Sequence, residues 1–260
     1  MHITTYPDID KLLSDLLDQM LRILGERLVG LYLYGSLVTG DFDREISDID
    51  LLAVTSSDID KQAFDRLERM HDDFAAKYQQ WRGRIEVAYL STAALKTFRS
   101  QISPIAIISP GEPLHIKEAG KDWLMNWWVV REQGVTLFGP APTTLIDPIS
   151  KHEFLEAVQQ HAQSWSEWVN DMRDQPGQAY AILTLCRALY TSIYGEQVSK
   201  KQAALSAQQR FPEWAELIQN ALAWRIGWRD QLVDPVATFP ETVRFVDFAI
   251  EQVLRSGSPD

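Results

Sequence analysis

Cysteine is almost absent from this sequence, which limits the chemistry open to the chain. Its 260 residues include one cysteine, Cys186, so internal disulfides and cysteine-based metal sites are excluded. Cys186 lies within an apolar run of helical spacing, which predicts a buried thiol in a protein from a reducing compartment. Histidine is also scarce, and His115, His152 and His161 lie singly without ligand spacing, so we expect no zinc site.

Positive charge is in deficit as well. The chain has 25 lysines and arginines against 36 aspartates and glutamates, a formal net charge of −11. Affinity for a phosphate backbone comes from cationic side chains that displace counterions, so we expect no nucleic-acid partner. An acidic surface attracts cationic small molecules, but it also simply keeps a protein in solution. We expect a cationic small-molecule partner, and the solubility interpretation stays open.

Long apolar runs are missing too. No stretch approaches ~18 consecutive apolar residues, and no basic segment followed by an apolar one opens the chain. We therefore expect neither export nor a membrane partner, and we predict a cytoplasmic monomer.

The most informative pattern that is present lies between residues 29 and 54. An apolar run over 29–34 predicts a strand that enters a turn at Gly35 and Ser36. A second strand pattern contains Asp48 and Asp50, which lie on one face because strand side chains alternate. Converging carboxylates repel one another, and a divalent cation with oxygen ligands relieves the conflict. The pair therefore predicts a Mg²⁺ site.

The spacing of these residues resembles a known family. Gly-Ser, a spacer of about ten residues and then Asp-x-Asp is similar to the nucleotidyltransferase superfamily that includes DNA polymerase β. Longer blocks over Leu33 to Ser36, Ser47 to Leu52 and Leu183 to Thr191 resemble the bacterial streptomycin/spectinomycin adenylyltransferases. This resemblance covers most of the chain.

The expected fold class is α+β. The resemblance implies an N-terminal nucleotidyltransferase domain over residues 1–148, a mixed sheet with flanking helices, and a C-terminal all-α helical bundle over 149–260. Prolines 140, 142 and 148 mark the linker. The patterns predict helices over about 8–28, 57–81 (capped by Ser57 and Asp58), 123–133, 151–172, 178–194, 200–210, 213–229 and 240–255, strands over 29–34, 48–54 and 84–90, and irregular structure over 100–122.

Glu86 is anomalous because it lies inside an otherwise apolar strand, where an unpaired carboxylate is costly to bury. On the pattern alone, a glutamate of an edge strand facing water remains an alternative. The resemblance implies instead a third carboxylate of the site, serving both as a Mg²⁺ ligand and as the general base.

Two cations in the second predicted domain complete the expected site. Arg187 lies in a helix with little polar face, so its guanidinium needs an anion or a carboxylate, and a structural ion pair is the alternative. Lys200 follows Ser199, a good helix cap, at the end where the helix dipole disfavours a cation unless an anion is near. The resemblance implies that Arg187 and Lys200 contact the phosphates of ATP.

The predicted activity is a Mg²⁺-dependent transfer of AMP from the co-substrate ATP to a hydroxyl of an aminoglycoside or aminocyclitol, with release of pyrophosphate. Asp48 and Asp50 would hold Mg²⁺, Gly35 with Ser36 and Ser47 would bind the nucleotide, and the hydroxyl would lose its proton to the general base. One alternative is a regulatory or antitoxin-type nucleotidyltransferase that AMPylates a protein. The other is a catalytically inactive nucleotide-binding module, which the complete carboxylate set disfavours.

The preferred acceptor is predicted from two positions at which this sequence differs from the family pattern. The resemblance implies a tryptophan after the third carboxylate and an acidic residue before the helix that starts near 178, both serving streptomycin. The matching segments are 109–114, which has no tryptophan, and 175–178, where Gly177 stands near the expected acid. Spectinomycin is therefore predicted to be a better acceptor than streptomycin.

Overall fold

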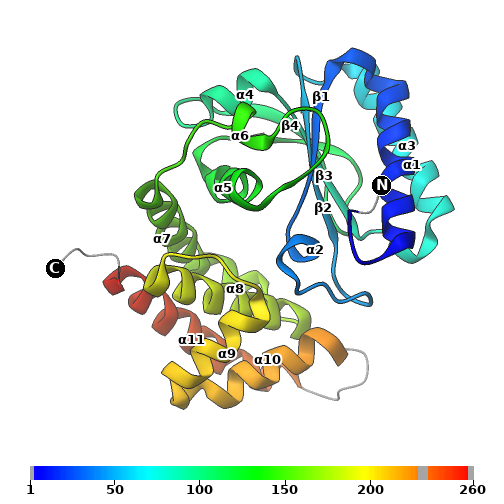
Figure 1. Ribbon diagram of the computed structural model, residues 1–260. Helices are drawn as coiled ribbons and strands as arrows, with labels where there is room; N and C mark the ends of the chain where they lie inside the picture. The colour runs from blue at the N-terminus through cyan, green and yellow to red at the C-terminus, as the bar shows by residue number, and fades with distance from the viewer. Residues whose placement is uncertain (1–2, 228–233, 257–260) are drawn as a thin grey trace. The chain divides into compact units, whose positions relative to one another are not determined.

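The computed structural model describes residues 3–227 and 234–256 and divides into two compact units, Met1–Ile149 (unit 1) and Ser150–Asp260 (unit 2). Unit 1 contains a six-stranded sheet with the strand order β5-β4-β3-β2-β1-β6 (Figure 1). Strands β2 and β3 pair in parallel and the other neighbours are antiparallel, which confirms the predicted mixed sheet. The strands are β1 Leu28–Tyr34, β2 Ile49–Thr55, β3 Ile85–Ser91, β4 Ser103–Ile108, β5 His115–Ala119 and β6 Val135–Phe138.

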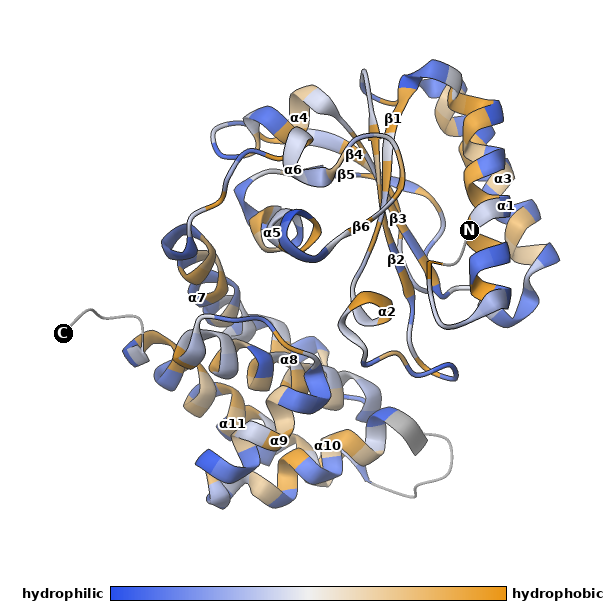
Figure 2. Ribbon diagram, in the orientation of Figure 1, coloured by the Kyte–Doolittle hydropathy of each residue, from blue (hydrophilic) through white to orange (hydrophobic). Residues whose placement is uncertain are grey.

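Helices cover both faces of this sheet. Helices α1 (Pro7–Leu24) and α3 (Lys61–Lys77) lie over one face and α5 (Leu124–Gln133) over the other (Figure 1). The apolar sides of α1 and α3 face the strands (Figure 2) because their apolar residues recur every three or four positions. Alternate residues of β2 and β3 join this core, and two of them, Leu51 and Val87, have no exposed surface. Asp50 and Glu86, one position earlier in each strand, therefore point to the opposite face.

The ends of two helices differ from the prediction. Helix α1 stops at Leu24, not near residue 28, because Gly25 adopts a positive φ of 55°. Helix α3 is capped by Asp60, whose carboxylate accepts a hydrogen bond from Ala63 N at 2.8 Å, and not by Ser57 or Asp58. The short elements of unit 1 are α2 Ser36–Thr39, α4 Thr92–Thr97, α6 Pro142–Leu145 and the 3₁₀ turns Gly25–Arg27, Gln79–Trp81 and Lys121–Trp123.

The prediction of irregular structure over 100–122 is wrong, since this stretch forms the antiparallel hairpin of β4 and β5. Pro104 lies inside β4 but beyond its pairing with β3, which begins at Ala106. The missing N–H of the proline therefore removes no bond of the β3 ladder. Strand β6, which pairs with β1, was also not predicted.

Unit 2 is helical, as predicted, throughout the part that the structure describes. Its helices are α7 Lys151–Trp168, α8 Gln175–Tyr194, α9 Lys200–Arg210, α10 Ala215–Gly227 and α11 Pro235–Ser256, with 3₁₀ turns Val169–Asp171 and Pro212–Trp214. Pro240 lies within α11 instead of at its start, and the predicted helix over 213–229 extends beyond the described residues.

Helix α8 is the central element of unit 2 and contacts α7, α9, α10 and α11. Its buried residues lie around the whole helix, as expected for a helix enclosed by others. Cys186 is fully buried, as predicted, and burial raises the pKa of its thiol. Across residues 3–227 and 234–256, no helix combines the length and apolar character needed to cross a membrane.

Candidate active site

Three polar side chains form a row across the centre of the sheet in unit 1. Tyr34 of β1 pairs with Asp50 of β2, and Asp50 pairs with Glu86 of β3. Directly paired residues on neighbouring strands present their side chains to the same face, so the row lies on the face covered by α5. The row lies at the end of β1 that leads into the Gly35 turn.

Gly35 allows the Asp50 carboxylate to lie against the backbone. Its φ is 75°, and a Cβ built at this position would lie 1.9 Å from Asp50 Oδ2. No other residue type fits there without moving the carboxylate. Ser36 then begins α2, whose first turn is closed by hydrogen bonds from Val38 N and Thr39 N to Gly35 O, both at 3.1 Å.

Ser47 and Asp48 lie directly before β2. Ser47 is 3% exposed, and its hydroxyl accepts a hydrogen bond from Asp43 N at 2.9 Å, so it stabilises the loop that carries the carboxylates. The Arg84 Nε donates to Ser47 O at 3.1 Å from the start of β3. Asp48 itself is half-buried and is close enough to Glu86 to affect its ionisation.

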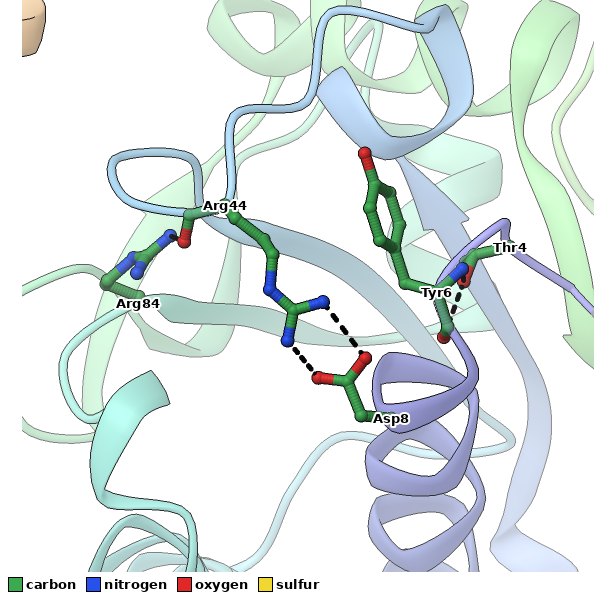
Figure 3. Close-up of polar contacts among 5 residues, drawn as sticks. All are labelled: Thr4, Tyr6, Asp8, Arg44 and Arg84. Atoms are coloured by element: carbon green, nitrogen blue, oxygen red, sulfur yellow. Dashed lines mark hydrogen bonds and ion pairs between the residues drawn. The ribbon is translucent and has the colours of Figure 1, made fainter.

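The loop between α2 and β2 is also anchored at Arg44. Arg84 donates to Arg44 O at 2.8 Å, and the Arg44 guanidinium forms a two-pronged ion pair with Asp8 in the first turn of α1 (Figure 3). Arg44 also lies over the ring of Tyr6, 5.7 Å from its centroid. These contacts tie the segment between α2 and β2 to two separate elements of the unit.

Glu86 is half-buried and lies in an interior strand, since β3 is placed between β2 and β4, and this rules out the edge-strand interpretation. Burial raises the pKa of its carboxyl, and the negative charge of Asp48 raises it further. The hydroxyl of Tyr34, 3.4 Å from Glu86 Oε1, and the charge of Lys117 act in the opposite direction. Glu86 and Asp48 therefore repel one another across the site.

The donor set fits Mg²⁺ as a partly assembled site. All the candidate ligands are carboxylate oxygens, the type that this ion prefers. In the described portion of the chain, however, no group of three or more His, Cys, Asp or Glu side chains is gathered closely enough to hold a metal. Magnesium is commonly bound by one or two carboxylates together with water and substrate phosphates, so a complete protein cage is not required.

Arg187 and Lys200 belong to unit 2. Arg187 is half-buried on α8, and its positive charge adds to burial in lowering the pKa of His161 to about 4. Lys200 is the first residue of α9, after the Ser199 cap, which accepts from Gln202 N at 3.1 Å. Its Nζ lies 4.1 Å from the ring centroid of Tyr180.

Tyr180 and Arg187 lie about two turns apart on α8 and so share one side of that helix. The two cations that the sequence singled out are therefore associated with the same side of α8.

Sequence reasoning missed Tyr34 and Asn126. Tyr34 is 8% exposed, and the Asn126 side chain of α5 donates a hydrogen bond to its hydroxyl. Burial and the charges of Glu86 and Asp50 raise the pKa of Tyr34 well above its usual value. The sequence signals for Tyr34 are its position directly before Gly35 and its place in the block over Leu33 to Ser36. Asn126 lies in an apolar helix and is part of no motif.

Family models match both parts of the chain. Residues 13–103 match the family described as "Nucleotidyltransferase domain", and residues 144–252 match "Aminoglycoside adenylyltransferase, C-terminal domain".

Curated relatives agree with these matches. The chain is 26% identical to an aminoglycoside (3'') (9) adenylyltransferase of Shigella flexneri over 95% of this chain and 97% of that protein. A Klebsiella pneumoniae protein of the same name is 30% identical over 48% of this chain and 47% of its own length.

A solved structure has the same fold. Spectinomycin adenyltransferase of Enterococcus faecialis, in complex with ATP and spectinomycin, superposes with a TM-score of 0.72 over 92% of this chain and 98% of that one. The sequence identity is 17%, so this likeness concerns the fold alone.

Proposed function

Because the chain belongs to the aminoglycoside adenylyltransferase family, we propose that it transfers AMP from ATP to a hydroxyl of an aminocyclitol or aminoglycoside antibiotic, which would confer resistance. The observation that carries this proposal is the row of Tyr34, Asp50 and Glu86, with Gly35 beneath the Asp50 carboxylate. In this row, the Asp50 carboxylate lies against the turn, where it can bind a cation. The Glu86 carboxylate is partly desolvated and can accept a proton.

The residues of unit 1 divide the chemistry between them. Asp48 and Asp50 would hold Mg²⁺, which when bound neutralises charge on the triphosphate. Gly35 and Ser36 bind phosphate oxygens through backbone N–H and hydroxyl groups, and Ser47 maintains the loop beside them.

Glu86 removes the proton from the acceptor hydroxyl. The hydroxyl oxygen forms a bond to the α-phosphorus, the bond from that phosphorus to the bridging oxygen breaks, and pyrophosphate leaves. Burial and Asp48 raise the pKa of Glu86, which makes its carboxylate a stronger base than an exposed one. Arg187 and Lys200 of unit 2 bind the phosphates as cations.

Spectinomycin is the preferred acceptor in this proposal. The turn of the β4–β5 hairpin, residues 109–114, has no aromatic side chain, and residues 175–178 form the first turn of α8 without an acid. The nearby carboxylate of Asp174 is already engaged, because it accepts from Gly177 N at 2.9 Å as the helix cap. A missing charge-assisted contact to a guanidinium costs about 1.5–3 kcal/mol, or about ten- to more than a hundredfold in affinity.

The test is a side-by-side measurement of kcat/KM for spectinomycin and streptomycin with ATP and Mg²⁺, read as pyrophosphate release. We expect spectinomycin to be favoured at least ~10-fold. Equal efficiencies would overturn the assigned preference. A panel of other aminocyclitols, and a lysate supplied with labelled ATP, extend the test. Label found on protein and on no small acceptor would contradict the proposed substrate class.

A further inference from the structure

We propose that Tyr34 is a positioning residue that fixes Oε1 of Glu86 and so presents Oε2 to the acceptor hydroxyl, with Asn126 orienting Tyr34 in turn. The inference rests on the proposed role of Glu86 as proton acceptor. It adds two residues to the transfer reaction: Tyr34, which lies within the block over Leu33 to Ser36 but receives no role from the resemblance, and Asn126, which lies outside every resembling block.

The first step is the reach of Tyr34 across the sheet. Its direct neighbour is Asp50, and Glu86 is one strand further. Neighbouring strands lie about 4.8 Å apart, so the phenol ring must extend over Asp50 for its hydroxyl to come within 3.4 Å of Glu86 Oε1. The ring therefore lies along the row, and its single polar atom is placed on the third strand.

The second step is the direction of the hydrogen bonds. An ionised carboxylate can only accept, so the Tyr34 O–H donates to Glu86. The single hydrogen of the Tyr34 hydroxyl goes to Glu86, so in the contact between Tyr34 and the Asn126 side chain the amide N–H donates to the Tyr34 oxygen. The amide thus occupies the acceptor site of the hydroxyl and directs its hydrogen toward Oε1. One oxygen of Glu86 is held, and the other is available for the substrate proton.

The third step is the rigidity of the support. Asn126 lies on α5, which packs against β1. Its neighbour Trp127 is 1% exposed and stacks on Trp123, with ring centroids 5.4 Å apart. A hydrogen-bond donor on a helix anchored by two large buried rings has little freedom. Groups that orient a reacting side chain work best from such fixed elements.

Strand β1 supplies a matched control. Tyr32 lies two residues before Tyr34 on the same face, is fully buried, and donates its hydroxyl to Pro140 O at 2.8 Å. Tyr32→Phe therefore removes a buried tyrosine hydroxyl and one hydrogen bond, as Tyr34→Phe does, but this hydrogen bond goes to the backbone of Pro140 and not to Glu86.

The experiment compares the two variants with the wild type. We expect Tyr34→Phe to lower kcat about 10- to 100-fold, the usual effect of removing a group that orients a functional side chain. The affinity for ATP with Mg²⁺, measured by calorimetry, should stay within about threefold, because the phosphate contacts are unchanged. Tyr32→Phe should keep kcat within about twofold at a similar loss of unfolding midpoint. Equal kcat values in the two variants would overturn the proposal.

Asn126→Ala tests the second residue and leaves the tyrosine in place, so it also serves if Tyr34→Phe does not fold. We expect kcat to fall in the wild-type background, but no further loss when the change is added to Tyr34→Phe, because Asn126 acts only through the hydroxyl. Additive losses would contradict the relay. A wild-type protein that transfers AMP to no acceptor would overturn the proposed function itself. That result differs from equal kcat values in the two tyrosine variants and from additive losses in the double variant.

Discussion

At the scale of the residue, the site depends on the absence of a side chain at Gly35. Gly35 has no Cβ, and the space a Cβ would fill is occupied by the Asp50 carboxylate at 1.9 Å. We expect Gly35→Ala to displace that carboxylate and to reduce AMP transfer at least ~10²-fold, with weaker binding of ATP and Mg²⁺.

Gly40→Ala is the control for this change. Gly40 also has a positive φ, 79°, but a Cβ there would meet nothing within 4 Å. It should cost about 1 kcal/mol in stability and leave transfer unchanged. Calorimetric titration of both variants with ATP and Mg²⁺ separates backbone strain from the contact with Asp50. Matching losses in the two variants would show that strain alone accounts for the effect.

The sequence predicted these residues one by one more reliably than it predicted their contacts. Alternation along one strand places Asp50 opposite the apolar core, and the structure confirms that face. The alignment of Asp50 with Tyr34 and Glu86 depends on the register between three strands, which no local pattern contains. Tyr34 belongs to a predicted strand and to the block over Leu33 to Ser36, but the sequence assigns it no role, although it lies within hydrogen-bonding distance of the candidate base.

At the scale of the element, helices were easier to predict than short strands. The spacing of apolar residues identifies α1 and α3 because each runs for many turns against one core. The β4–β5 hairpin was missed because three prolines made residues 100–122 resemble a loop, and two of them, Pro110 and Pro113, do lie in its turn. The start of α3 was misplaced because more than one capping residue was available, and the end of α1 because Gly25 adopts a positive φ.

The cap of α3 gives a prediction at this scale. Asp60 accepts from Ala63 N and also pairs with Arg27 at 2.8 Å, whereas Asp58, predicted from the sequence together with Ser57, accepts from Arg27 through its backbone carbonyl. We expect Asp60→Ala to destabilise the protein by about 1 kcal/mol and Asp58→Ala to have no measurable effect. Urea unfolding followed by circular dichroism measures both. A larger loss for Asp58→Ala would restore the cap predicted from the sequence.

At the scale of the whole molecule, the chain joins two units with separate family matches, over residues 13–103 and 144–252. The proposed function assigns the proton transfer to Glu86 in unit 1 and phosphate binding to Lys200 in unit 2. Substitution of Glu86 should therefore lower kcat, because this residue acts in the chemical step. Substitution of Lys200 should instead raise the Kd and KM for ATP, because this residue acts in binding.

Glu86→Gln and Lys200→Ala test this division. Glu86→Gln keeps the size of the side chain and removes its charge, so ATP should bind within a few fold of the wild type while kcat falls at least ~10²-fold. Lys200→Ala should raise the Kd and KM for ATP with a smaller change in kcat, because a phosphate contact is lost before and during the reaction alike. Lys201→Ala is the matched control, since Lys201 is the next residue of α9 and has no assigned role. Titration calorimetry and steady-state kinetics on the three variants decide the matter. If Lys200→Ala and Lys201→Ala weaken ATP binding equally, general charge and not a specific contact explains the effect of unit 2, and the role given to Lys200 is wrong.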